Sequence, residues 1–256
     1  MDALSYHGKR WKNGEVNNVD DAMAVEVPLE IQLDNFPFST TMCSPGDLEA
    51  LVRGLLHTED LYRGVLTDLH VSINKKDNTH LYIAKVHAKT PWNKPFKGTR
   101  QLLSVTSCGI CGNQHFDKKK GASLKGKKFD ATKISTMFND MNAAQSQFLN
   151  TGGSHAASIF NSNSELLSIG QDIGRHNATD KAIGKLLMNG KLKEGSYLLV
   201  SGRLSYEIMA KAFSAGIPNV CSVSAPSSLA IDVAKEWGMN LLGFCRNDRF
   251  TLYASD

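Results

Sequence analysis

The chain of 256 residues has few cysteines and no long hydrophobic run. Five cysteines are present, and Cys43, Cys221 and Cys245 stand alone, which is not the spacing of a secreted disulfide framework. No apolar stretch approaches the roughly 20 residues of a bilayer-spanning helix. Residues 1–18 lack the apolar core of a signal peptide. We therefore expect a cytoplasmic protein without a membrane segment, in a compartment where thiols stay reduced.

Aromatic residues are missing from the most basic part of the chain. Six lysines fall within residues 118–128, and no aromatic side chain lies among them to stack on bases. Nucleic acid is therefore not an expected partner. The cluster fits a solvated loop, and it also fits a docking surface for an acidic partner or a polyphosphate. Its members are Lys118, Lys119, Lys120, Lys125, Lys127 and Lys128.

Cys108 and Cys111 form the one close cysteine pair, whose spacing indicates metal binding, thiol redox exchange or sulfur handling. A zinc ribbon would need a second pair. A thioredoxin-like site would need a strand that runs directly into a helix at the pair, but glycine and lysine follow it. A zinc deaminase would need a glutamate where Ala157 follows His155, and a proline where Ser107 precedes the pair. Two readings remain: inert thiols, or an exposed thiol whose basic surroundings favour the nucleophilic thiolate.

The first half of the chain predicts a small α+β unit after a flexible tail over residues 1–24. Alternating apolar residues predict a hairpin over residues 25–42, with its turn at Asp34 and Asn35. A helix should follow, capped by Ser44 and with Pro45 at its first position. Two strands come next, over residues 66–74 and 80–88.

The second half predicts a long helix over residues 132–149 and then alternating strands and helices. This alternation is typical of an α/β sheet covered on both faces. The predicted strands are residues 165–169, 197–200, 219–223, 241–244 and 249–253. The predicted helices are residues 178–188, 206–215 and 228–237.

Polar loops follow the predicted strands of this second half. They cover residues 171–177, 201–205 and 224–228, and a fourth begins at Cys245. Strand ends share one edge of an open α/β sheet, and three of these loops lead into helix N-termini, which attract anions. Each residue alone could have an ordinary structural role, but together they predict a site for a ligand with several phosphates. The candidate binding residues are Arg175, His176, Arg203, Ser227, Arg246 and Arg249.

From about residue 25 to its end, the chain resembles the formate dehydrogenase accessory sulfurtransferases, the FdhD/NarQ family of sulfur carriers. The motifs that carry this resemblance are Glu26-Val27-Pro28-Leu29, Ser107-Cys108-Gly109-Ile110-Cys111-Gly112, Gly152-Gly153-Ser154-His155-Ala156, Asp172-Ile173-Gly174-Arg175-His176-Asn177-Ala178, Ser201-Gly202-Arg203, Ser224-Ala225-Pro226 and Gly243-Phe244-Cys245-Arg246. The resemblance implies a small α+β roll domain, residues 25–106, and a cytidine-deaminase-like three-layer α/β domain, residues 107–256. Residues 107–130 would form a mobile loop that carries the thiols and lysines.

The resemblance also implies a function. Members accept persulfide sulfur from a cysteine desulfurase and transfer it to the molybdenum (or tungsten) bis-guanine-dinucleotide cofactor, which formate dehydrogenase needs for activity. This chain would then be a sulfurtransferase and a homodimer, with the desulfurase and apo formate dehydrogenase as partners, and the cofactor as bound substrate. No permanent cofactor or metal is expected. Cys108 would carry the persulfide and Cys111 would assist. Cofactor binding is implied for Phe244, Cys245, Arg246, Asn247, Asp248 and Arg249. The alternatives are a non-catalytic cofactor-binding chaperone for the apoenzyme and a zinc-binding adaptor.

Overall fold

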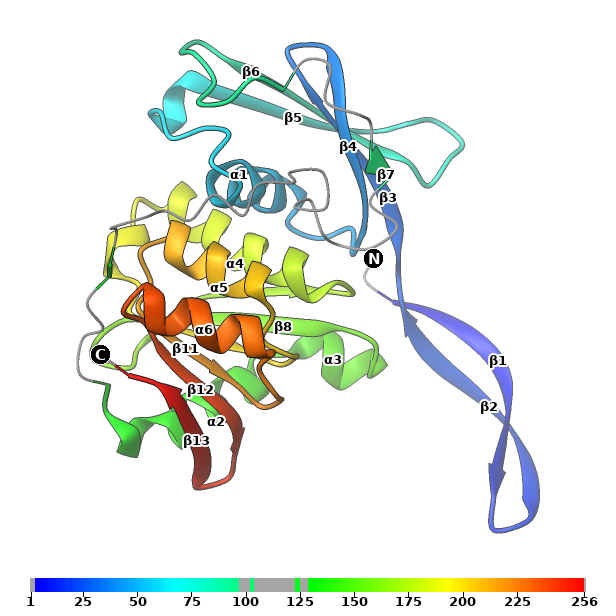
Figure 1. Cartoon of the computed structure of the whole chain (residues 1–256). Coiled ribbons are helices and arrows are strands. Elements are labelled where there is room, and N and C mark those ends of the chain that lie inside the picture. The colour runs from blue at the N-terminus through cyan, green and yellow to red at the C-terminus, as the bar shows by residue number, and fades with distance from the viewer. Residues whose placement is uncertain (1–2, 97–101, 104–122, 125–128, 256) are drawn as a thin grey trace.

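The computed structural model describes residues 3–96, 102–103, 123–124 and 129–255, and the strands among them form three sheets (Figure 1). Cys108, Cys111 and the six clustered lysines lie outside the described residues. What we expect of the thiol pair, and of a mobile loop over residues 107–130, therefore stays a prediction.

Alternating apolar residues build the five-stranded sheet, whose strand order is β5-β6-β3-β4-β7. β3 (Val27–Leu33) buries every second side chain. The predicted turn at Asp34 and Asn35, both with positive φ, joins it to β4 (Phe36–Cys43). The other strands are β5 (Leu69–Lys75), β6 (Tyr82–Ala88) and β7 (Leu102–Leu103). The apolar side of α1 (Leu48–Thr58) covers this sheet and completes the predicted α+β unit.

Ser44 does not cap α1, contrary to our expectation. The helix begins at Leu48, and its N-cap residue is Asp47, in the left-handed region with φ of 56°. Ser44 Oγ instead accepts hydrogen bonds from Ile173 N–H at 3.1 Å and from Gln147 Nε2 at 3.0 Å. The hydroxyl joins the two domains and is therefore not available to the helix.

Residues 1–24 were expected as a flexible tail, but the structure has a long hairpin there. β1 (Ala3–Lys12) pairs with β2 (Glu15–Ala24) along its whole length, and Asn13 and Gly14 make the turn with positive φ. This hairpin, the arm, projects away from the rest of the molecule (Figure 1). Its mixture of polar and apolar residues hides the alternation that a half-buried strand would show.

The large sheet has the order β13-β12-β11-β10-β8-β9. β10, β11 and β12 are parallel to one another, and the outer pairs are antiparallel. Its strands are β8 (His155–Phe160), β9 (Leu166–Asp172), β10 (Tyr197–Val200), β11 (Asn219–Ser222), β12 (Asn240–Arg246) and β13 (Arg249–Ala254). β8 was missing from our prediction, although its run of buried small and apolar residues is typical of a strand covered on both faces.

Helices cover both faces of this sheet, as predicted. α4 (Arg175–Met188), α5 (Tyr206–Ser214) and α6 (Ser228–Glu236) pack on one face, and α2 (Ile134–Ala143) packs on the other (Figure 1). The predicted helix over residues 132–149 is interrupted at Gln145, whose ψ of 61° is not helical, and α3 (Ser146–Thr151) follows. Short 3₁₀ helices are η1 (Leu66–Asp68), η3 (Ala131–Lys133) and η4 (Leu192–Glu194).

The predicted α/β class, with a three-layer domain after the α+β unit, is confirmed. No helix within the described ranges could cross a membrane, since none combines enough length with enough apolar character.

The two domains meet where α1 crosses α4. A Cβ added at Gly54 would lie 1.9 Å from the carbonyl oxygen of Asp180, and one at Gly184 would lie 1.8 Å from that of Ala50. Glycine at both positions therefore lets the two helix backbones come into direct contact.

Gly54→Ala should destabilise the protein. Alanine normally stabilises a helix interior by about 1 kcal/mol relative to glycine. Here the methyl group must push α4 away, so we expect a loss of about 1–3 kcal/mol or more in the free energy of unfolding. Urea denaturation measures it. Gly8→Ala in the arm is the control, because a Cβ there meets only Val19 at 3.9 Å. A Gly54→Ala protein at least as stable as wild type would contradict the close crossing.

Candidate functional site

The ends of neighbouring strands meet at one edge of the large sheet. β8 is antiparallel to both β9 and β10, so β9 runs in the same direction as β10, β11 and β12. His155 at the start of β8 is therefore opposite Asp172 at the end of β9. The segments after β9, β10, β11 and β12, which we predicted as polar binding loops, all lie along this edge, where open α/β sheets bind ligands.

Asp172 anchors the segment that begins α4. Its buried carboxylate accepts hydrogen bonds from the N–H groups of Gly174 at 2.8 Å and Ser44 at 2.9 Å, and from Asn177 Nδ2 at 3.1 Å. Lys181 Nζ forms an ion pair with it at 2.7 Å. Four donors from both domains thus hold the first turn of α4. We predicted Arg175 and His176 in a loop, and the structure places them in this turn instead.

His155 touches the loop after β10. Its Nδ1 lies 3.2 Å from Ser201 Oγ, which also accepts the Ala156 N–H at 2.9 Å. A Cβ on Gly202 would lie 3.2 Å from the His155 ring and 3.4 Å from Arg175 Cδ. Burial and the positive charge of Arg175 lower the pKa of His155. The edge thus has one small area where the neutral imidazole of His155, the backbone of Gly202 and the aliphatic part of Arg175 lie together.

His176 lies deeper, between α4 and α5. Its Nε2 is 3.4 Å from Ser205 Oγ and 4.0 Å from Glu207 Oε2, and its Nδ1 has no hydrogen-bond partner among the described residues. Burial, reinforced by the positive charges of Arg175 and Lys211, lowers its pKa to about 4. Because only 6% of the residue is exposed, His176 supports the wall of the edge more than it offers a contact surface.

Hydrogen bonds join the loops after β10 and β11. Ser222 Oγ donates to the carbonyl oxygen of Gly202 at 2.5 Å, and Leu204 N–H donates to the Ala225 carbonyl oxygen at 3.2 Å. Ser227 Oγ accepts the Ala230 N–H at 3.2 Å and so caps α6. These bonds hold the loop that presents Arg203, which is exposed.

Phe244 to Arg249 form the end of β12, a tight turn and the start of β13. Phe244 has φ of 56° and is 44% exposed, which brings an aromatic ring to the surface of the edge. Arg246 Nε donates to the Val223 carbonyl oxygen at 3.2 Å, and Arg246 and Arg249 are opposite each other across the pair of strands. Asn247 and Asp248 make the exposed turn.

Cys245 differs from the other predicted binding residues. Its side chain is buried in the core under α2, and burial raises the pKa of its thiol to about 11. Contact of Cys245 with a ligand would therefore involve its backbone. The other two cysteines among the described residues, Cys43 and Cys221, are also reduced and buried.

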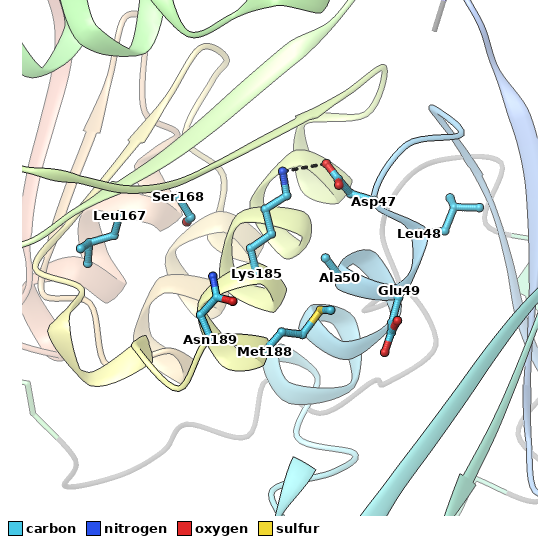
Figure 2. Close-up of a pocket in the computed structure, with 9 residues that line it drawn as sticks. All are labelled: Asp47, Leu48, Glu49, Ala50, Leu167, Ser168, Lys185, Met188 and Asn189. Carbon is cyan, nitrogen blue, oxygen red and sulfur yellow. Dashed lines mark ion pairs between the residues drawn. The ribbon is translucent and has the colours of Figure 1, made fainter. Parts of the chain in front are cut away.

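A separate hollow of about 350 Å³ lies away from this edge, between the start of α1, the end of α4 and β9 (Figure 2). Lys185 crosses it and pairs with Asp47 at 2.7 Å. Its lining contains none of the predicted site residues. The lining residues are Asp47, Leu48, Glu49, Ala50, Leu167, Ser168, Lys185, Met188 and Asn189.

The structure thus brings Arg175, Arg203, Arg246 and Arg249 to one sheet edge. Sequence reasoning did not place His155 there, because it missed β8, whose run of buried residues was the available signal. Within the described part of the chain, no group of three or more His, Cys, Asp or Glu side chains could hold a metal ion.

Loss of the neutral form of His176 should weaken the fold in acid. Its pKa is near 4 in the folded protein and 6.5 when unfolded, so the unfolded chain takes up this proton first as pH falls. The stability that depends on neutral His176 is lost progressively as the pH falls from 6.5 to 4. By pH 5 the loss in the free energy of unfolding is about 2 kcal/mol. Urea denaturation at pH 7 and pH 5 should therefore show a smaller acid loss for His176→Gln than for wild type. His80→Gln, at an exposed position, should lose as much as wild type. Equal losses for His176→Gln and wild type would contradict this burial.

Comparison with known proteins gives one consistent result. The model of the FdhD/NarQ family matches residues 24–256. A sulfur carrier protein FdhD from Sulfurisphaera tokodaii is 38% identical over 239 residues, which cover 91% of this chain and 90% of that protein. One of the same name from Streptomyces avermitilis is 35% identical over 260 residues, covering 96% and 92%.

A solved structure supports the fold. A crystal structure from Desulfotalea psychrophila, described as that of a formate dehydrogenase accessory protein, superimposes with a TM-score of 0.76 over 99% of this chain and 97% of that one, at 22% identity. The resemblance that the sequence motifs indicated is confirmed, and the chain belongs to the FdhD/NarQ family.

Proposed function

We propose that this protein is a sulfur carrier for the maturation of formate dehydrogenase. As a sulfurtransferase it would accept sulfur from a cysteine desulfurase on Cys108. It would then pass the sulfur to the molybdenum (or tungsten) bis-guanine-dinucleotide cofactor, its bound substrate. The observation that carries the proposal is the sheet edge with its four arginines, which could hold a ligand rich in phosphate. The names of the relatives, which are sulfur carriers, support the sulfur transfer.

The edge suits a guanine dinucleotide in its charge and in the side chains that it exposes. Guanidinium groups pair with phosphate oxygens through two parallel hydrogen bonds, and the N-termini of α4, α5 and α6 add positive partial charge. Phe244 offers an exposed ring on which a base can stack. Gly202 lets the loop after β10 pack closely on His155 and Arg175, since a Cβ there would lie only 3.2 Å from the His155 ring.

The sulfur chemistry would proceed in two transfers. The Cys108 thiolate attacks the outer sulfur of the desulfurase persulfide, a new S–S bond forms on Cys108, and the desulfurase cysteine leaves as thiolate. Attack of the Cys111 thiolate on the inner sulfur of this persulfide would then release the outer sulfur as hydrosulfide. That step leaves a disulfide between Cys108 and Cys111, which a cellular thiol reduces. The released sulfur becomes a ligand of the cofactor metal.

Incubation with a cysteine desulfurase and cysteine should add the mass of one sulfur atom to the protein. Mass spectrometry should locate it on Cys108, because that thiol is the proposed acceptor. Cys108→Ala should abolish the added mass. Cys43→Ala is the matched control and should keep it, since Cys43 is buried and burial raises the pKa of its thiol to about 12.

The same variants separate a carrier from a chaperone. If Cys108→Ala protein still produced active formate dehydrogenase at the wild-type level, the non-catalytic cofactor chaperone would be the better description. If neither Cys108 nor Cys111 gained sulfur, the carrier function would be wrong. Zinc in the purified protein would favour an adaptor.

Guanosine diphosphate should bind at the sheet edge as a fragment of the cofactor. Arg203→Ala and Arg246→Ala should each weaken binding roughly tenfold or more, because a hydrogen bond to a charged group contributes about 1.5–3 kcal/mol. Isothermal titration calorimetry measures this. Lys193→Ala is the control, since Lys193 is exposed just before β10, at the opposite end of the strands. Equal losses in all three variants would indicate a general charge effect and contradict a site at this edge.

A further inference from the structure

His155 lies at the same sheet edge as the arginines but is not one of the binding residues that the sequence predicted. It begins β8, which lies between β9 and β10 in the sheet. Asp172, at the end of β9, is opposite it on one side, and Ser201, just past the end of β10, touches its ring on the other. The half-buried imidazole is therefore fixed between two segments that form the edge.

The two nitrogens of the His155 ring have different surroundings. Nδ1 lies 3.2 Å from Ser201 Oγ. A Cβ on Gly202 would lie 3.2 Å from both Nδ1 and Cε1, so the loop after β10 covers this side of the ring. Nε2 has no hydrogen-bond partner among the described residues, although it is not one of the polar atoms buried without a partner. The Nε2 side is therefore the side of the ring that solvent or a ligand can reach.

Hydrogen bonding at Ser201 determines which nitrogen of His155 carries the proton. Ser201 Oγ accepts the Ala156 N–H at 2.9 Å, so this hydroxyl still needs an acceptor for its own proton. Among the described residues, the acceptor within reach is His155 Nδ1. A neutral imidazole has one N–H, so acceptance at Nδ1 leaves Nε2 as the donor. Burial and the charge of Arg175 lower the pKa of His155, which keeps the ring in this neutral form.

Arg175 brings positive charge close to this donor. Its Cδ and the His155 ring both border the same point, since a Cβ on Gly202 would lie 3.4 Å from the first and 3.2 Å from the second. Arg175 is also the first residue of α4, whose N-terminus carries positive partial charge. An anion beside the ring would be attracted by both, and one of its oxygens could accept the Nε2 proton.

We propose that His155 is a ligand-binding residue whose Nε2–H donates a hydrogen bond to a phosphate oxygen of the bound cofactor, with Ser201 as the positioning residue that fixes this tautomer. The inference rests on the proposed function, because it concerns the ligand of the same edge. Arginines attract an anion from many directions, whereas a single N–H selects an oxygen that lies along its own direction. His155 thus adds orientation to the attraction that the arginines supply.

Isothermal titration calorimetry with guanosine diphosphate tests the contact. His155→Phe keeps a ring of similar shape but has no N–H, so it should weaken binding roughly tenfold or more. His155→Gln places an amide N–H near the position of Nε2 and should recover most of this loss. His80→Phe is the matched control and should bind like wild type, because His80 is exposed between β5 and β6 of the small domain. Circular dichroism checks that each variant is folded.

Nitrogen NMR of isotope-labelled histidines tests the tautomer without any ligand. The signals of His155, identified by their loss in His155→Gln, should show a proton on Nε2 and none on Nδ1. Ser201→Ala should raise the fraction of molecules with the proton on Nδ1, and should weaken guanosine diphosphate binding less than His155→Phe does. A wild-type protein with the proton on Nδ1 would overturn the proposal, because Nε2 could not then donate.

The outcomes separate this contact from the proposed function. If Arg246→Ala weakens guanosine diphosphate binding but His155→Phe does not, the edge holds the ligand and the role of His155 is wrong. Equal losses in folded His155→Phe and His155→Gln would show that the ring packs and does not donate, which also overturns the proposal. If wild type does not bind guanosine diphosphate, both the contact and the nucleotide site are wrong, and sulfur loading of Cys108 remains the separate measure of the carrier function.

Discussion

The buried carboxylate of Asp172 is the constraint on which the rest of this structure depends. It lies at the end of β9 with no exposed surface, and it is satisfied from both domains: Ser44 N–H from one, and Gly174, Asn177 and Lys181 from the other. Removal of any partner would leave a buried charge or a buried polar group without compensation, which is far more costly than loss of a surface ion pair. The position of the small domain and the start of α4 are therefore set together. The direction in which Arg175 leaves that helix follows from both.

α4 extends this constraint across the whole junction. Further along the helix, Asp180 accepts Thr58 Oγ of α1 at 2.8 Å and pairs with Lys211 of α5 at 2.8 Å. One turn later, Gly184 lets the α1 backbone come into contact. A helix that is buried on nearly every side, with polar residues matched one by one to neighbours, cannot rotate or slide without the loss of several such matches. The sheet edge is rigid for this reason, although it is built largely from loops.

The sequence was sufficient to predict the fold where buried residues recur at the regular spacing of a strand or a helix. The hairpin with its turn at Asp34 and Asn35, the α/β alternation and the gathering of polar loops at one edge could all be predicted, because each depends on local patterning or on a general rule of sheet topology. It was insufficient where partners come from far along the chain. The predicted start of α4 was three residues late because Arg175, His176 and Asn177 are polar, and only the distant Asp172 network explains their helical burial. Ser44 looked like a helix cap until the other domain was present to use its hydroxyl. The arm shows no alternation, because the body of the molecule covers only a small part of it.

The electrostatics of the edge follow from the same packing. Both His155 and His176 are near Arg175, and burial together with that positive charge keeps their imidazoles neutral at neutral pH. The positive charge of the edge therefore belongs to arginines, which do not titrate in the physiological range, and to helix N-termini, which carry no proton to lose. A phosphate ligand bound there would meet the same field across the pH range of a cell. The neutral imidazole of His155, which is only partly buried, would offer a directional hydrogen bond without adding charge. The arginines would thus supply the attraction for an anionic ligand, and His155 could supply a directional contact, while the buried His176 keeps the wall of the edge in place.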